Sequence, residues 1–207
     1  LNDLSVAAAH LSFNHTRPCD PRALQAEFDR VAADLNEEFR EIYSCSDRGK
    51  VGYLLYTLWG RDAICPSCQK TFSIWDAIDR ESGRMPLLVT CPRCGVGTAK
   101  QGLKYAGSKP VLLSYETASG QRVERAPNAA DLKLIAEQAA IAPRDWFPDV
   151  HIDPSREMYI RSALHLQGIK TVADFYMPRN LRALARLWAR IQQVTDDRLR
   201  AGLRSAP

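Results

Sequence analysis

The 207-residue sequence has no apolar run long enough to cross a membrane, and no secretory signal is evident in it. It has six cysteines, four of which form two closely spaced pairs. We therefore expect a cytoplasmic protein, because disulfides are rare in that compartment. Hydrophobic residues make up 45% and charged residues 25% of the chain, as is typical of a globular protein of one or two domains.

Several arrangements that carry enzyme chemistry are missing. The sequence shows no Ser-His-Asp pattern, no phosphate-binding loop and no paired-carboxylate site. Its four histidines, His10, His15, His151 and His165, are isolated along the chain. We expect them to be structural or solvated, and we predict no catalytic residue within these 207 positions.

The strongest signal in the sequence is a pair of Cys-Pro-x-Cys turns. Cys65 and Cys68 form the first turn, and Cys91 and Cys94 form the second. Two such pairs are the ligand set of a closed tetrahedral zinc site, which predicts one structural Zn²⁺ held by four thiolates. A catalytic zinc would need an open position for water. The gap from Gln69 to Thr90 is slightly longer than usual and has room for a two-stranded hairpin.

The residues around the cysteines agree with tight turns. Pro66 and Pro92 fix φ within the turns, and Gly95 permits the positive φ that a zinc knuckle usually needs. Two disulfides or four unrelated thiols are the alternative interpretation. Cys19 and Cys45 have no partner motif, so we expect them to be ordinary thiols.

Charge is distributed unevenly along a chain whose net charge is only +4. Residues 46–110 carry ten Lys/Arg against five Asp/Glu, and residues 178–207 carry seven against two. Residues 1–45 and 111–177 are acidic, with four against eight and seven against nine. The two basic segments suggest contact with a polyanion, although solvated faces would look the same.

Periodicity and capping signals in the first half predict two helices and a set of strands. Leu1–Ser5 resembles the end of a strand that runs into a helix ending near Asn14. Asp20 and Pro21 then open a long helix with an apolar stripe from Leu24 to Ile42, whose acidic face we expect to be solvated. After a polar turn at 46–50, strands are predicted over 51–59, 71–75 and 86–90, with a loop at 80–84.

The second half is predicted to be a mixed region that ends in a helix. Strands over 111–116 and 121–125 flank a hairpin turn, and Asn128 caps a helix that runs through Ala140 with Leu132, Ile135 and Ala139 on one side. Residues 142–154 form a loop whose Trp146-Phe147-Pro148 packs into a core or on a neighbour.

The last predicted helix runs from Pro178 to Gln193. Its apolar face is formed by Leu181, Leu184, Trp188 and Ile191. Arg182, Arg186 and Arg190 lie four residues apart along one line of this helix. They form either a solvated face or a stripe that follows DNA phosphates.

Taken together, these segments resemble the large SAM-dependent, adenine-specific DNA methyltransferases that carry an inserted zinc ribbon. The resemblance rests on segments that occur in the same order over nearly the whole chain: Asn2-Asp3-Leu4-Ser5 with Ala8 and Asn14, the Tyr/Trp-rich strand from Gly52 to Trp59, the two Cys-Pro-x-Cys turns with Trp75-Asp76 between them, Trp146–Pro148, and Phe175–Leu181 with the helix that follows. Apart from the cysteines, none of these motifs is specific by itself.

The resemblance implies methyl transfer from SAM to an exocyclic amine of DNA, with Asp3 accepting hydrogen bonds from the SAM ribose hydroxyls. An acceptor-only carboxylate suits that role, whereas a turn residue or helix cap is the alternative for Asp3. The glycine-rich loop and the Asp/Asn-Pro-Pro-aromatic tetrapeptide of the family are absent, and Asp153-Pro154-Ser155-Arg156 does not replace the tetrapeptide. Since the chain also begins with Leu1, we expect a piece of a longer protein that is inactive by itself.

The resulting fold prediction is α+β. It places a partial Rossmann-like methyltransferase edge (strand-helix-helix) at 1–45, a zinc ribbon insertion at 46–110, a mixed α/β insertion at 111–177 and a returning methyltransferase helix at 178–207. DNA is the expected partner, held by basic side chains around the ribbon: Arg61, Lys70, Arg84, Arg93, Lys100 and Lys104.

Two alternatives remain from the sequence. One is a non-enzymatic zinc-ribbon module that binds nucleic acid or protein. The other is a structural insert that assembles with further subunits of a restriction-modification or defence system.

Overall fold

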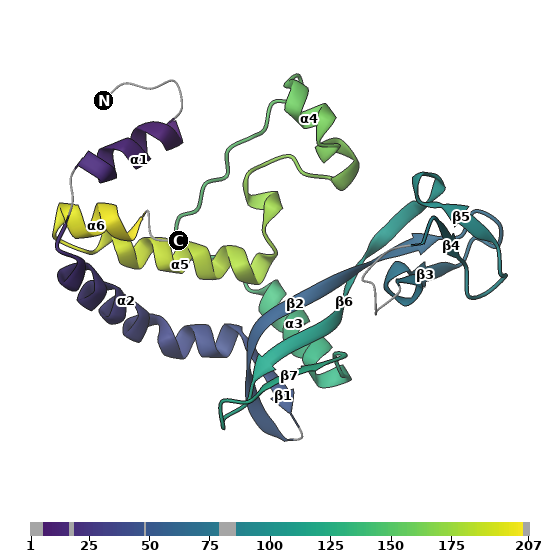
Figure 1. Ribbon diagram of the computed structural model, residues 1–207, viewed down its shortest axis with the longest axis horizontal. Helices are drawn as coiled ribbons and strands as arrows, with labels where there is room; N and C mark the ends of the chain where they lie inside the picture. The colour runs from purple at the N-terminus through teal and green to yellow at the C-terminus, as the bar shows by residue number, and fades with distance from the viewer. Residues whose placement is uncertain (1–5, 17–18, 48, 79–85, 205–207) are drawn as a thin grey trace. The chain divides into compact units, whose positions relative to one another are not determined.

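The computed structural model describes residues 6–16, 19–47, 49–78 and 86–204 (Figure 1). It confirms the α+β class, with helices and a mostly antiparallel sheet. The chain divides into two compact units, a helical unit of residues 1–42 and 135–207 and a central unit of residues 43–134. The hairpin that follows the ribbon in the sequence belongs to the same unit as the ribbon. The predicted strand at Leu1–Ser5 and the ribose-binding Asp3 lie outside the described residues.

The helical unit is built from four principal elements: α1 (Val6–Thr16), α2 (Pro21–Ile42), α5 (Pro178–Gln192) and α6 (Asp197–Leu203). Between α3 and α5 lie the short helix α4 (Glu157–Arg161) and the 3₁₀ turns η3 (Leu164–Gln167) and η4 (Ala173–Phe175). Residues 142–150 form no helix or strand, as predicted.

The start of α2 confirms the capping signal read from the sequence. The Asp20 carboxylate accepts a hydrogen bond from the backbone N–H of Arg22 at 2.9 Å, and Pro21 is the first helical residue. Val31 and Leu35 of α2 then pack with Ile191, Val194 and Leu203 to form the core of the unit. Most of the predicted apolar stripe of α2 therefore packs into this core.

The three arginines that form a line along α5 are not simply solvated, because each has a partner within the helical unit. Arg186 pairs with Glu38 at 2.9 Å, and both nitrogens of the Arg190 fork approach Asp34 at 2.5 and 2.8 Å. Arg182 donates to the side-chain carbonyl of Gln138 at 2.5 Å. The acidic face of α2, expected to be only solvated, supplies two of these partners. The regular spacing of these arginines thus lets each of them bond to another segment packed within the helical unit.

The central unit contains a sheet with strand order β1-β2-β6-β7, in which β3 also pairs with β2, and a separate β4–β5 pair. Its strands are β1 (Ser44–Asp47), β2 (Lys50–Ile64), β3 (Thr71–Ser73), β4 (Leu88–Thr90), β5 (Gly97–Ala99), β6 (Lys104–Glu116) and β7 (Arg122–Arg125). Two 3₁₀ turns, η1 (Ile74–Ala77) and η2 (Lys100–Gly102), and helix α3 (Ala129–Ala140) complete the order; the boundary between the units falls within α3.

Strands β2 and β6 are much longer than the sequence predicted. They run side by side from Tyr53↔Glu116 to Ile64↔Lys104, with three register irregularities (Figure 1). A polar turn was predicted at 46–50, but Ser46 and Asp47 belong to β1 and Lys50 begins β2, and these two strands pair with each other. The strand predicted at 71–75 ends at Ser73, where the chain turns into η1. The two long strands β2 and β6 together form an arm that leads to the cysteine turns.

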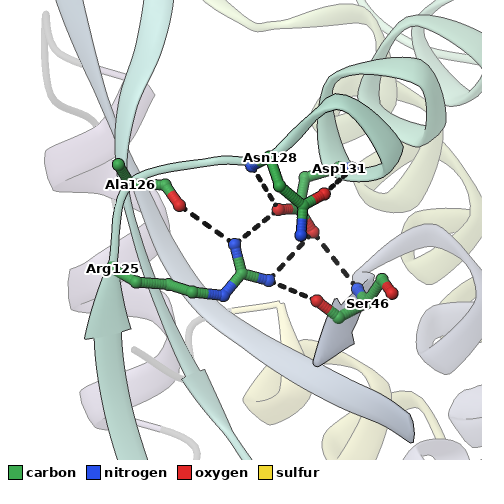
Figure 2. Close-up of polar contacts among 5 residues, drawn as sticks. All are labelled: Ser46, Arg125, Ala126, Asn128 and Asp131. Atoms are coloured by element: carbon green, nitrogen blue, oxygen red, sulfur yellow. Dashed lines mark hydrogen bonds and ion pairs between the residues drawn. The ribbon is translucent and has the colours of Figure 1, made fainter. Parts of the chain in front are cut away.

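The residues that anchor the base of this arm converge on Asp131, whose side chain is 1% exposed (Figure 2). Its carboxylate accepts from Arg125 at 2.5 and 3.2 Å and from the backbone N–H groups of Asn128 and Ser46 at 2.8 and 3.2 Å. Asn128 returns the bond by accepting from the Asp131 N–H at 3.0 Å, so the two residues form a reciprocal cap on α3. Arg125 also donates to the Ala126 carbonyl at 3.0 Å and lies over the Tyr115 ring.

This network corrects the face predicted for α3. Leu132 is 44% exposed, while Asp131, Ile135 and Gln138 are buried. The caps were readable in the sequence, but the burial of a charged residue was not, because it depends on Arg125 arriving from β7.

Burial would by itself raise the pKa of Asp131, but the Arg125 guanidinium and the Asn128 and Ser46 N–H groups outweigh it and hold this pKa below its ordinary value of 3.8. Replacing Asp131 with Asn should cost about 3 kcal/mol of unfolding free energy at pH 7, because Arg125 loses its counter-charge. The carboxylate's contribution is present at neutral pH and is lost as pH falls below about 4, through the lowered pKa.

Urea unfolding of wild type and Asp131→Asn at pH 7 and pH 3 measures this difference, which should shrink at the lower pH. Asp149→Asn, at an exposed position, is the matched control and should change stability little at either pH. Equal destabilisation of Asp131→Asn at both pH values would contradict the role assigned to the charge.

Candidate metal centre

Both cysteine turns have the same backbone geometry, and each closes a β-hairpin. Cys65 N–H donates to the Lys70 carbonyl at 3.0 Å, and Gln69 N–H donates to the Cys65 carbonyl at 3.0 Å. In the second turn, Cys91 N–H donates to the Val96 carbonyl at 3.0 Å, and Gly95 N–H donates to the Cys91 carbonyl at 2.9 Å. The pattern repeats bond for bond, so the two turns are equivalent knuckles.

The conformation that the knuckle demands was predicted at only one of the two equivalent positions. Gly95 has φ 74°, as expected, but its counterpart Gln69 also has a positive φ of 57°. The Gln69 side chain donates back to the Pro66 carbonyl at 2.9 Å, a local bond that accompanies the left-handed backbone. A glycine signal alone could not reveal this position.

The strand order around the knuckles matches the prediction, but the pairing does not. The expected hairpin within the gap would join the strands near 71–75 and 86–90. Instead β3 pairs with β2 across the first knuckle, and β4 pairs with β5 across the second. Each knuckle thus joins its own hairpin, and the four sulfurs lie where the two hairpins meet.

The four Sγ atoms of Cys65, Cys68, Cys91 and Cys94 all lie within 4.8 Å of one another. Cys65 and Cys94 are 3.6 Å apart at sulfur, and Cys68 and Cys91 are 3.8 Å apart. A tetrahedron with zinc–sulfur bonds of about 2.3 Å has sulfur–sulfur edges of about 3.8 Å. A disulfide would bring two sulfurs to about 2.05 Å. The geometry therefore fits one tetrahedral ion and excludes the two-disulfide alternative for these residues.

The surroundings make this a closed, structural type of site. Cys65 and Cys91 are buried, Cys68 is half-buried and Cys94 is exposed. A small apolar cluster lies against the sulfurs and is formed by Ala63, Phe72, Ile74, Val89 and Leu103. Four thiolates fill a tetrahedral shell, so no position remains where water or substrate would bind a catalytic zinc.

Backbone N–H groups of the knuckles also affect the pKa values of the cysteine thiols. N–H groups of Cys68 and Ser67 point at the Cys65 sulfur and lower its pKa to about 6. At Cys94 the Val96 N–H favours the thiolate, but desolvation and the three neighbouring sulfurs outweigh it and raise the pKa to about 11. The backbone of the first knuckle therefore favours the thiolate form of Cys65, and a bound cation would supply the charge that keeps all four sulfurs deprotonated.

Other predicted site residues do not join this cluster. Cys45 is buried and Cys19 is half-buried, and neither belongs to the group of four cysteines. Arg84, predicted to contact DNA, lies outside the described residues, as does Asp3. No helix in the described part of the chain is both long and apolar enough to cross a bilayer.

Comparison with known proteins leaves this geometry as the primary guide. No family model, no curated protein and no solved structure matches the chain.

The metal site predicts one equivalent of zinc per chain. Cys68→Ser and Cys94→Ser should each lose most of the metal, and a chelator should unfold the ribbon, because the metal-binding energy is part of the folding energy. Metal analysis and circular dichroism before and after chelation measure both effects. Cys19→Ser is the control and should keep a full equivalent; retention of metal and stability by Cys68→Ser would refute the assignment.

Proposed function

We propose that this chain is a segment of a SAM-dependent, adenine-specific DNA methyltransferase, and that its zinc ribbon and arm help to hold DNA. The observation that carries the DNA-holding part is a group of uncompensated cations beside the four-cysteine centre. Residues 60–109 contain eight Lys/Arg and four Asp/Glu, a surplus equal to the net charge of the entire chain.

The ribbon cations differ from the arginines of α5 in how they are used. Within the described residues, Lys70, Arg93, Lys100 and Lys104 are exposed and take part in no ion pair, while Lys109 pairs with Asp62 at 3.2 Å. Arg186 and Arg190 are both paired to carboxylates. Free cations on a rigid scaffold suit phosphate contact, because each contact releases counterions from DNA. The ribbon is therefore the better candidate for DNA than α5.

The register of the sheet gathers some of these cations. Lys104 of β6 lies opposite Ile64 of β2, and Ile64 lies opposite Thr71 of β3, directly after Lys70. The metal holds the knuckle at this end of the sheet, so its loss should disperse the cations as well as unfold the ribbon.

The methyltransferase part of the proposal rests on the resemblance and on the order of elements. Helices α1 and α2 follow Asp3 along the chain, as a strand-helix-helix edge requires. SAM would supply the methyl group. The role of Asp3 would be to accept hydrogen bonds from the ribose hydroxyls, and the described residues supply no base that would act on the adenine amine.

The second candidate is a non-enzymatic zinc-ribbon module that binds nucleic acid or protein. It is favoured by the lack of a catalytic constellation among the described residues. The coding sequence on either side distinguishes the two: a glycine-rich loop upstream and a Pro-Pro-aromatic tetrapeptide downstream favour the enzyme. If the flanking coding sequence contains neither motif, the non-enzymatic binding module becomes the better interpretation.

The DNA-holding role predicts a specific salt dependence. The double variant Lys100→Gln/Lys104→Gln should bind duplex DNA more weakly and reduce the slope of log K against log salt by about two, since each lost phosphate contact removes about 0.9. Fluorescence anisotropy of a labelled duplex at several salt concentrations measures the slope.

Arg161→Gln, an exposed arginine of α4, is the matched control and should leave the slope unchanged. If the double variant and the control behave alike, the ribbon cations do not contact DNA. Complete indifference of the wild-type chain to DNA would instead support the structural-insert alternative.

A further inference from the structure

The helical unit has an apolar groove that neither the metal centre nor the ribbon cations use. A cavity of about 380 Å³ lies between residues 146–148, α5 and α6. We name it the aromatic groove, and its principal walls are Trp146, Tyr176, Leu184, Trp188 and Arg204. Its volume lies in the range typical of sites for small organic ligands.

The rings of the groove are open to solvent rather than packed as a core. Trp146 is 64% exposed, Tyr176 44% and Trp188 36%. The indoles of Trp146 and Trp188 have centroids 6.1 Å apart and are tilted by 40°, so they do not cover each other by parallel stacking. A planar ring of a ligand could therefore stack on the exposed face of Trp146.

The groove has one charged group, and that group has no counter-charge. The Arg204 guanidinium lies 5.1 Å from the centroid of the Trp188 ring and donates to the neutral side chain of Gln192. No carboxylate among the described residues pairs with it. A purely apolar occupant would bury this cation uncompensated, which is costly, whereas an anionic occupant would satisfy it.

We propose that the aromatic groove binds an unpaired nucleotide, with the base stacked on Trp146 and the phosphate on Arg204. Flat rings with an attached phosphate match both the exposed indoles and the lone guanidinium, as in single-strand binding proteins that combine stacking with basic groups. This inference deepens the proposed function and rests on it, because it gives the DNA-holding chain a second contact that duplex DNA cannot make.

Tryptophan fluorescence of the full chain tests the groove with three probes: adenosine 5′-monophosphate, adenosine and ribose 5-phosphate. Adenosine 5′-monophosphate should quench the tryptophan fluorescence, and adenosine should bind more weakly than the monophosphate. Ribose 5-phosphate should leave the fluorescence unchanged. Trp146→Ala and Arg204→Ala should each weaken the binding of adenosine 5′-monophosphate about tenfold, in line with the loss of one stacked base or one charged contact. Trp146→Phe should restore most of the binding, because it keeps a ring.

Two controls separate the groove from general effects. Arg198→Ala removes an exposed arginine of the same helix α6, outside the groove, and Trp75→Phe removes an indole of the ribbon; both should bind like wild type. No quenching by the monophosphate at millimolar concentration overturns the proposal. So does stronger competition by an aliphatic carboxylate such as octanoate, which would make the groove an apolar docking surface.

The failure of this inference can be told apart from the failure of the proposed function. Trp146→Ala should lose preference for a single-stranded decamer while retaining salt-dependent binding of duplex DNA. The Lys100→Gln/Lys104→Gln variant should show the reverse. Loss of duplex binding in Trp146→Ala, with circular dichroism unchanged, would contradict the separation of the two sites.

Discussion

The convergence of four sulfurs on one point is the constraint on which the distal half of the central unit depends. The first and second knuckles belong to different hairpins, and β3 and β4 do not pair with each other. The apolar cluster that joins them consists of five side chains besides the cysteines. Such a cluster is too small to order a ribbon alone, whereas structural zinc typically contributes about 10 to 16 kcal/mol of binding energy. A bound metal would thus take the place of a larger hydrophobic core.

Charge pairing divides the molecule into compensated and uncompensated regions. In the helical unit, Arg186 and Arg190 are neutralised by acids of α2, which stabilises helix packing. At the base of the arm, Arg125 and Asp131 neutralise each other. Four exposed cations near the cysteine turns, Lys70, Arg93, Lys100 and Lys104, have no such partners within the described residues. The chain is close to neutral overall, so its unpaired positive charge is concentrated at the end of the arm that carries the four cysteines.

The proposed functions use different physical chemistry in the two units. Phosphate contact at the ribbon would be electrostatic, sensitive to salt and indifferent to sequence. Stacking in the aromatic groove would depend on ring contact and would select unpaired bases. The two units would then respond to the same nucleic acid in distinguishable ways.

The limits of sequence-based prediction follow from particular residues. The cap at Asp20 and the stripe of α2 were predictable, because both depend on neighbours within one helical turn. The length of β6 was not, because Lys104–Pro110 contains glycine, proline and lysines that disfavour a strand until β2 pairs with them. The α5 arginines have helical spacing in the sequence, yet the α2 carboxylates that pair with Arg186 and Arg190 lie 148 and 156 positions earlier in the chain. Only packing could distinguish an internal ion pair from a phosphate contact.

Local spacing was enough to predict the four cysteines that gather at one point, the caps at Asp20 and Asn128, and the helices α2, α3 and α5, since each depends on a few neighbouring residues. Tertiary structure decided which strands pair, which cations remain free, why Gln69 takes a left-handed backbone, and how Trp146, Trp188 and Arg204 come to share one groove. These features depend on contacts between segments far apart in the chain, and no local pattern encodes them.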